Sequence, residues 1–192
     1  MTFINIDDDS SVDGMYVKHC YEAGKFKAGD TILELPRFLI HSNLRTGWGK
    51  YSGQYMFDWD DQLGVSNKDK QQMKKDGYER AFSCWIYNKN IGQMLWQRWS
   101  KTEGKSLDAV LTAAYSKENK PENIDNMSMH VIYEGSEKKD FGMSSGYQAI
   151  LTFVEWVQTP DDFKPLSHDQ SDSANNSETK EKEPLISDEI PF

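Results

Sequence analysis

The sequence contains no run of about 18 apolar residues, so it does not predict a membrane-spanning helix. The stretch from Met1 to Ser11 holds an Asp triplet and no basic segment, so no secretory signal peptide is expected. There are only two cysteines, Cys20 and Cys84, and they stand far apart in the chain. This use of cysteine fits a reducing cytoplasm better than a disulfide scaffold or a zinc site, so we expect a cytoplasmic protein.

Apolar residues are also scarce, since hydrophobic residues make up 37% of the chain, but aromatic residues reach 12%. A length of 192 residues allows one domain of ordinary size and a tail. From Thr159 onward the composition becomes polar, and such a segment cannot bury enough apolar area to offset its ordering entropy. The expected parts are an acidic N-terminal segment (1–13), a folded core (14–158), a disordered linker (159–185) and a C-terminal tip (186–192).

The net charge of −9 is unevenly distributed along the chain. Residues 165–192 hold seven acids and two lysines, and residues 1–13 hold four aspartates. Residues 14–120, by contrast, hold 17 Lys/Arg and 12 Asp/Glu, a balance of +5. Such asymmetry bears on binding partners rather than on the fold. A mildly basic middle is compatible with binding a phosphate backbone but does not require it.

Two periods of apolar residues alternate along the core. Segments rich in β-branched and aromatic residues predict five strands, of which Gly53–Trp59 alternates strictly and Tyr147–Val157 is apolar on both faces, as in a central strand. Helical spacing is seen at Tyr78, Phe82, Trp85 and Ile86, continues at Ile91, Leu95 and Trp99, and recurs at Leu107, Val110, Leu111 and Ala114, where Ser106 is a candidate N-cap. The predicted strands are Met15–Tyr21, Thr31–His41, Gly53–Trp59, Ser128–Glu134 and Tyr147–Val157. The sequence thus predicts three strands, a helical insert and two further strands.

The stretch 45–59 is rich in aromatic, basic and glycine residues. In a strand, Tyr51, Tyr55, Phe57 and Trp59 fall on one face. Unpaired bases stack on flat aromatic rings and their phosphates need nearby cations, so the stretch is a candidate site for single-stranded nucleic acid. The alternative is that this aromatic face belongs to the core. Further candidates in the stretch are Arg45, Lys50 and Trp48, the last of which we expect in a loop between glycines.

A second source of positive charge is the first predicted hairpin, with Lys18, Lys25, Lys27 and Arg37. In a small barrel this hairpin would lie beside Trp48 and extend the same surface. We therefore add Lys25, Lys27 and Arg37 to the candidate binding residues.

Motifs for catalysis or metal binding are incomplete. Residues 142–146 match the spelling of a nucleophile elbow, but a strand follows them where a helix is required. Acidic side chains of the segment 58–61 together with Glu79 are a candidate magnesium site, and Glu103 belongs to a nuclease-like E-x-K spelling, but turn capping and solvation explain them more simply. The histidines show no metal-ligand spacing. We expect no enzyme activity, no metal and no cofactor.

The chain ends in Ile190-Pro191-Phe192, preceded by Asp188 and Glu189. Phe192 carries its α-carboxylate beside a large ring, so a pocket with an apolar floor and a basic rim would hold both. Pro191 restricts the backbone and lowers the entropy lost on docking. The ending resembles the acidic tip of bacterial and phage single-stranded DNA-binding proteins. The alternative is a frayed terminus with a chance apolar ending.

The resemblance covers about seven residues and implies both a fold and a function. The fold would be a β-rich α+β core, a five-stranded OB-like barrel with a helical insert between its third and fourth strands. The protein would coat single-stranded DNA with little sequence preference, and the tip would recruit replication, recombination and repair proteins. A phage protein of this kind would act in the bacterial host cell, as a monomer or a homo-oligomer. The alternatives are a tip-mimicking protein that captures host replication factors without binding DNA, and a metal-dependent nuclease.

Overall fold

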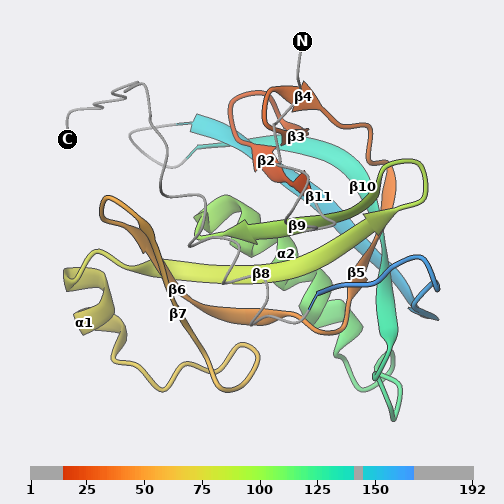
Figure 1. The fold of residues 1–192 in the computed structure, drawn as a ribbon. Helices are drawn as coiled ribbons and strands as arrows, with labels where there is room; N and C mark the ends of the chain where they lie inside the picture. The colour runs from red at the N-terminus through yellow and green to blue at the C-terminus, as the bar shows by residue number, and fades with distance from the viewer. Residues whose placement is uncertain (1–14, 141–144, 167–192) are drawn as a thin grey trace, which may run out of the picture. The chain divides into compact units, whose positions relative to one another are not determined.

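The computed structural model describes residues 15–140 and 145–166 (Figure 1). The predicted N-terminal segment, the linker beyond residue 166 and the tip lie outside the described residues. Within the described part the protein is β-rich, with two helices. Helix α1 spans Lys70–Lys75 and helix α2 spans Lys101–Ala114. The strands are β1 (Met15–Tyr16), β2 (Lys18–Cys20), β3 (Lys25–Ala28), β4 (Thr31–Ile32), β5 (Arg37–His41), β6 (Arg45–Tyr51), β7 (Tyr55–Trp59), β8 (Glu79–Asn88), β9 (Gly92–Arg98), β10 (Met127–Asp140) and β11 (Ser145–Gln158).

The strands form one large mixed sheet and one small sheet. The large sheet has eight strands in the order β1-β9-β8-β5-β10-β11, with β6 paired to β8 and β7 paired to β6. Strand β1 pairs in parallel with β9, and the other pairs are antiparallel. The large sheet is not closed, and β2, β3 and β4 form the small sheet.

The main core lies between one face of the large sheet and helix α2. Leu107, Val110 and Ala114 of α2 are buried against strand residues such as Phe82 and Trp96. Helix α2 begins after Ser100, whose hydroxyl accepts a hydrogen bond from the amide of Glu103 and so satisfies one of the open donors of the first turn. We call this side of the sheet the core face.

The predicted helical insert at residues 78–99 is wrong, because this segment forms the antiparallel strands β8 and β9. The run Ala81–Tyr87 is buried along its whole length, since β8 lies between β9 on one side and β5 and β6 on the other. A central strand is apolar on both faces, so its apolar residues match helical spacing by chance. Gly92 adopts a φ of 98° and allows the tight connection between the two strands.

The predicted helix around residues 107–114 is confirmed, but its N-cap is Ser100 rather than Ser106. Ser106 lies inside the helix and is buried. Its hydroxyl lies 3.1 Å from the carbonyl oxygen of Thr102 and 2.7 Å from that of Ala149, and the second contact connects α2 to β11. All five predicted strand regions contain strand, and the first two are divided into shorter strands.

The linker does not begin at residue 159, because residues 159–165 pack on the core. Strand β11 ends at Gln158, as the Pro160-Asp161-Asp162 sequence predicts. The side chain of Phe163 is only 3% exposed and stacks on Tyr87 with 5.2 Å between ring centroids. The hydroxyls of Thr159 and Ser128 are hydrogen-bonded at 2.9 Å. These contacts extend the folded core to Pro165.

Candidate nucleic-acid interface

Strands β6 and β7 form a hairpin that is held to the large sheet through β8. Within it, Gly47 pairs with Trp59 and Tyr51 pairs with Tyr55. Glycine at position 47 is required by packing, because an added Cβ would lie 2.9 Å from the Trp59 ring and closer still to backbone atoms. At Gly49 an added Cβ would lie 3.0 Å from the Phe57 ring. The glycines of β6 therefore let these two rings lie close to the strand.

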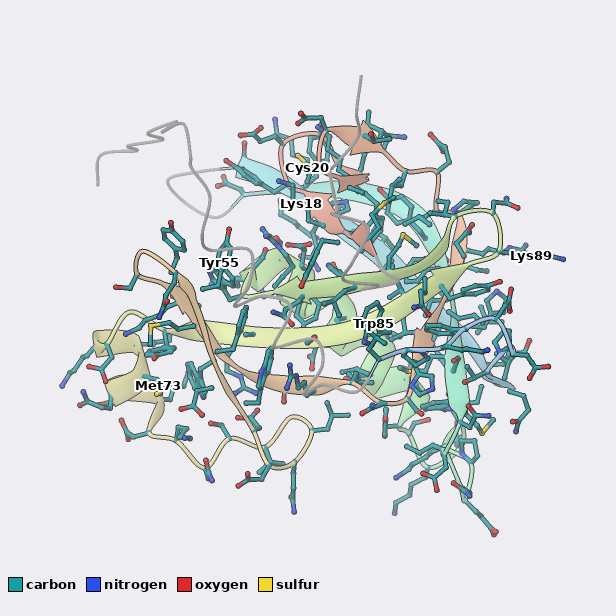
Figure 2. All side chains as sticks on the ribbon, in the orientation of Figure 1. Lys18, Cys20, Tyr55, Met73, Trp85 and Lys89 are labelled. Atoms are coloured by element: carbon teal, nitrogen blue, oxygen red, sulfur yellow. The ribbon has the colours of Figure 1, made fainter. Side chains whose placement is uncertain are left out.

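One face of the hairpin carries a continuous row of aromatic rings, which we call the aromatic strip. The strip consists of Tyr51, Tyr55, Phe57 and Trp59 together with Trp99, which follows β9 (Figure 2 labels Tyr55). The Tyr51 and Tyr55 centroids lie 5.2 Å apart, and Trp99 lies 5.4 Å from Tyr55 and 5.6 Å from Phe57. Phe57 and Trp59 are stacked at 4.9 Å with 5° between ring planes. The prediction that these four residues of 51–59 share a face is confirmed.

The strip combines exposed rings with guanidinium groups. Tyr51 and Tyr55 are 58% and 59% exposed, and the other three rings are half-buried. The guanidinium carbon of Arg45 lies 4.0 Å from the centroid of Trp59, within the range of a cation–π contact. That of Arg98 lies 6.0 Å from the centroid of Trp99. Exposed aromatic faces cost free energy in water, so such a row indicates a binding surface.

Trp48 does not belong to the strip, and the prediction that it lies in a loop is wrong. It lies in β6, is 1% exposed, and donates a hydrogen bond from its indole N–H to Ser66. Lys50 lies with it on the opposite side of β6 from Tyr51, where its ammonium sits 4.2 Å from the centroid of Tyr78 and donates to the carbonyl of Asp76. Residues of the segment 60–78 thus contact this side of the hairpin, so neither side chain presents a surface for stacking.

The basic residues of the first predicted hairpin are not beside Trp48. Lys25 and Lys27 lie on β3 of the small sheet, which is joined to β10 and β11 by hydrogen bonds such as that from Tyr133 to the carbonyl of Gly24. Arg37 lies near Asn88, at the end of β8 opposite to the hairpin. The nine-residue separation along β8 corresponds to about 30 Å. The structure thus places Arg37 away from the strip, whereas Lys25 and Lys27 lie on a different sheet from it.

The acidic residues near the hairpin are engaged by cations and amides. Asp60 accepts from both terminal nitrogens of Arg80 at 3.2 and 2.7 Å and from the hydroxyl of Thr46 at 2.7 Å. Asp58 pairs with Lys68 at 2.9 Å, and this contact raises the pKa of the lysine. Asp58 and Asp60 therefore have a structural role, since their contacts hold the 60–78 segment to the hairpin and to β8. Among the described residues, no three His, Cys, Asp or Glu side chains gather as a metal site.

Glu103 lies in the first turn of α2 and contacts Arg98, the residue before Trp99 at the end of the strip. Its carboxylate is 2% exposed and accepts from the backbone of His19 at 2.7 Å, from the indole of Trp96 at 2.9 Å and from the Nε of Arg98 at 2.9 Å. A buried charge with three donors is well compensated. The Arg98 guanidinium is thereby held with its central carbon 6.0 Å from the centroid of the Trp99 ring. Burial lowers the pKa of His19, and the nearby Glu103 carboxylate partly offsets that effect.

Trp99 and Arg98 are the candidate site residues that sequence reasoning missed. The turn-like composition of Asn88-Lys-Asn-Ile-Gly92 is a signal for two strands over 79–98, which would place Arg98 at the end of a strand. The contact of Trp99 with the hairpin spans more than 40 residues of sequence, and no local pattern signals it.

The described helices are too short and too polar to cross a membrane. Comparison of the chain with family models, curated proteins and solved structures found no match in any of the three.

Proposed function

We propose that the protein binds single-stranded DNA without catalysis, and that the aromatic strip is its binding surface. The observation that carries this proposal is the contiguous row of five rings flanked by Arg45 and Arg98. Every base presents a flat π-face, so such a row holds unpaired bases with little sequence preference, and the guanidinium groups hold phosphates. The separation of acidic ends from a basic middle supports the same proposal.

The order of the strands supports an OB-like core. An OB fold has five strands in Greek-key order, with ligands on strands two and three and on the loop between strands one and two. Taking β5 with β6 as strand one, β8, β9, β10 and β11 follow as strands two to five, and α2 lies between strands three and four. The pairs β5–β8, β8–β9, β5–β10 and β10–β11 agree with this assignment. On that assignment the aromatic strip occupies the ligand-binding loop and the end of strand three.

We further propose that the acidic tip recruits replication, recombination and repair proteins to the coated DNA. The tail and DNA carry charge of the same sign, so the tail should weaken DNA binding at low salt. Removing residues 180–192 is expected to tighten oligo-dT binding most at low salt, and an unchanged affinity would contradict the competition. Phe192→Ala is expected to abolish partner docking while DNA affinity stays within about twofold, because the aromatic ring rather than the charge is removed.

The function is tested by titrating the full chain with fluorescent oligo-dT over a salt series, with and without Mg²⁺. Binding that weakens with salt and leaves the oligonucleotide intact is the expected result. Absence of binding at low salt would instead favour a protein that captures host factors through its tip. Cleavage that depends on Mg²⁺ would favour a nuclease.

A further inference from the structure

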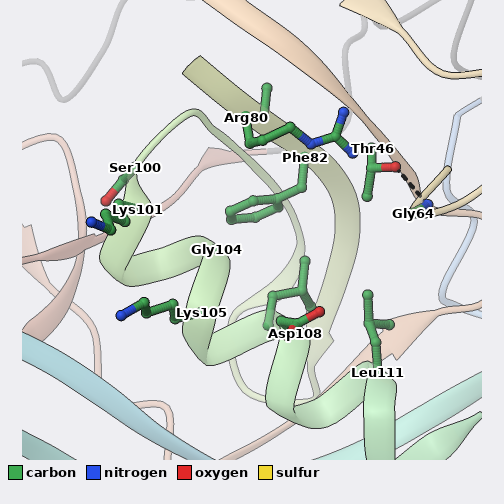
Figure 3. A pocket seen from close by; sticks show the side chains of 12 residues that line it. Thr46, Gly64, Arg80, Phe82, Ser100, Lys101, Gly104, Lys105, Asp108 and Leu111 are labelled. Atoms are coloured by element: carbon green, nitrogen blue, oxygen red, sulfur yellow. Dashed lines mark hydrogen bonds between the residues drawn. The ribbon is translucent and has the colours of Figure 1, made fainter. Parts of the chain in front are cut away.

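A concave surface lies on the core face, on the opposite side of β6 and β8 from the strip. It is a cavity of about 370 Å³ between α2 and strands β6 and β8, within the size range of small-ligand sites (Figure 3). Its inner wall is apolar and includes Phe82, Leu107 and Leu111. Lys101 and Lys105 lie at its rim, one helical turn apart on α2, and both are exposed. In Figure 3 the two lysine side chains extend to the same side of the helix.

Gly104 lies between these two lysines and also lines the cavity. Glycine in a helix interior is unfavourable relative to alanine, because it leaves more conformational freedom to the unfolded chain. No packing requirement accounts for it here, since an added Cβ would meet no atom within 4 Å. The bare backbone at this position allows a ligand to approach the helix closely.

The strip and the cavity lie on opposite sides of the sheet, because Gly47 and Gly49 face the strip whereas Thr46 and Phe82 line the cavity. Residues 98–101 connect the two surfaces at the end of β9. Trp99 contacts Tyr55 and Phe57 on the strip, whereas Ser100 and Lys101 line the cavity. Two peptide units place the Cα atoms of Trp99 and Lys101 at most about 7.6 Å apart. A DNA strand that leaves the strip at Trp99 and passes around the end of β9 therefore meets the cavity rim at Lys101.

We propose that this cavity is a second nucleotide subsite, which takes a base of the strand beyond Trp99 while Lys101 and Lys105 hold its phosphates. The proposal rests on the DNA-binding function above and adds a specific path. The apolar wall suits the base, and the ammonium groups suit the backbone. Neither lysine has an ion-pair partner among the described residues, so both charges are available to a polyanion. Asp108, also at the rim, lies one turn further along α2. Its carboxylate repels phosphate, so we expect the bound strand to end before it.

The test compares oligo-dT of about 4 and about 16 nucleotides, the limits of site size for one OB fold. Lys101→Gln with Lys105→Gln is expected to weaken binding of the long oligonucleotide about tenfold and that of the short one less than twofold. The salt slope for the long oligonucleotide should fall by about 1.4, since each phosphate contact on a single strand contributes about 0.7. Lys117→Gln with Lys120→Gln, beyond the C-terminal end of α2, is the matched control and should change neither.

Gly104→Leu separates a ligand subsite from a structural role. Leucine is a better helix former than glycine and would occupy the cavity, so the melting temperature should rise or hold while the long oligonucleotide binds about tenfold more weakly. Unchanged affinity for the long oligonucleotide in both cavity variants would overturn the subsite and leave the strip intact. Equal losses for both lengths would also overturn it, because the cavity would then not be a separate subsite. Failure of the unmodified chain to bind either length would overturn the DNA-binding function itself.

Discussion

The two faces of the β6–β7 hairpin are built from the same kinds of residue and differ in what covers them. On one face Trp48 and Lys50 contact residues of the 60–78 segment, and Trp48 is nearly inaccessible. On the other face Tyr51 and Tyr55 are more than half exposed. A tryptophan between glycines is thus a core residue, while tyrosines at the hairpin end form the surface. Aromatic content identifies the hairpin as important, and the covering segment decides which face is able to bind.

The largest expected effect is a difference between the two faces in how much a substitution lowers the free energy of unfolding. Trp48→Ala should lower the free energy of unfolding by about 3–5 kcal/mol, since a fully buried indole and its hydrogen bond to Ser66 are lost. Tyr55→Ala should lower it by less than about 1 kcal/mol, because the ring is mostly exposed. Urea denaturation of both variants provides the measurement. Equal losses of unfolding free energy in the two variants would show that the two faces contribute equally to the core.

The second prediction concerns DNA binding, for which substitutions on the exposed face should have the larger effect. Tyr51→Ala with Tyr55→Ala should weaken oligo-dT binding about 30-fold or more, because each stacked base contributes about 1–3 kcal/mol. Ile32→Ala serves as a control, since that side chain is equally exposed on the small sheet. Fluorescence anisotropy measures both variants. If the double tyrosine variant bound oligo-dT with unchanged affinity, the strip would not be the binding surface.

A third prediction uses two arginines that the sequence does not distinguish. Arg45→Gln should reduce the slope of log affinity against log salt by about 0.7, the contribution of one phosphate contact on a single strand. Arg37→Gln should leave the slope unchanged, because Arg37 lies at the opposite end of β8. An equal reduction in both variants would indicate a binding path over the other end of the sheet.

The smallest expected effect concerns pH. Burial lowers the pKa of both His19 and His41 below the ordinary value, so the folded protein favours the neutral rings. Histidines of the unfolded chain take up protons as the pH falls below about 6.5, whereas those of the folded protein do so only at lower pH. This contribution to stability is therefore complete above about pH 6.5 and is lost as the pH falls from there through the lowered pKa values of the folded protein. The urea concentration at the unfolding midpoint should decrease when the pH is lowered from 7.5 to 5.5. His41→Gln should show a smaller fall, and an identical fall would exclude His41 as a contributor.

The sequence predicts the shared face of Tyr55, Phe57 and Trp59 correctly because strand β7 alternates strictly. Tyr51 shares this face because it lies opposite Tyr55 on the neighbouring strand β6. The prediction fails at β8, where burial on both faces removes the period and leaves a spacing that resembles a helix. It also fails at Phe163, where a single ring in a polar stretch packs on Tyr87 and extends the core.

The remaining errors concern contacts distant in sequence. Trp48 is interpreted as a loop residue because its flanking glycines suggest a turn, whereas those glycines make room for Phe57 and Trp59. Trp99 contacts the strip from the position directly after β9, and Arg37 lies away from the strip because β5 begins at the far end of β8. Local patterns predict which residues share a strand face, but the order of strands in the sheet decides which faces meet.

The most direct test of the strip is photo-crosslinking of oligo-deoxyuridine carrying bromine at every base to the full chain, followed by mass mapping of the crosslinked peptides. The expected crosslinks fall on the exposed rings of Tyr51 and Tyr55 and on the half-buried ring of Trp99 beside them. Crosslinks confined to the small sheet or to β10 and β11, with none on the β6–β7 hairpin, would contradict the account.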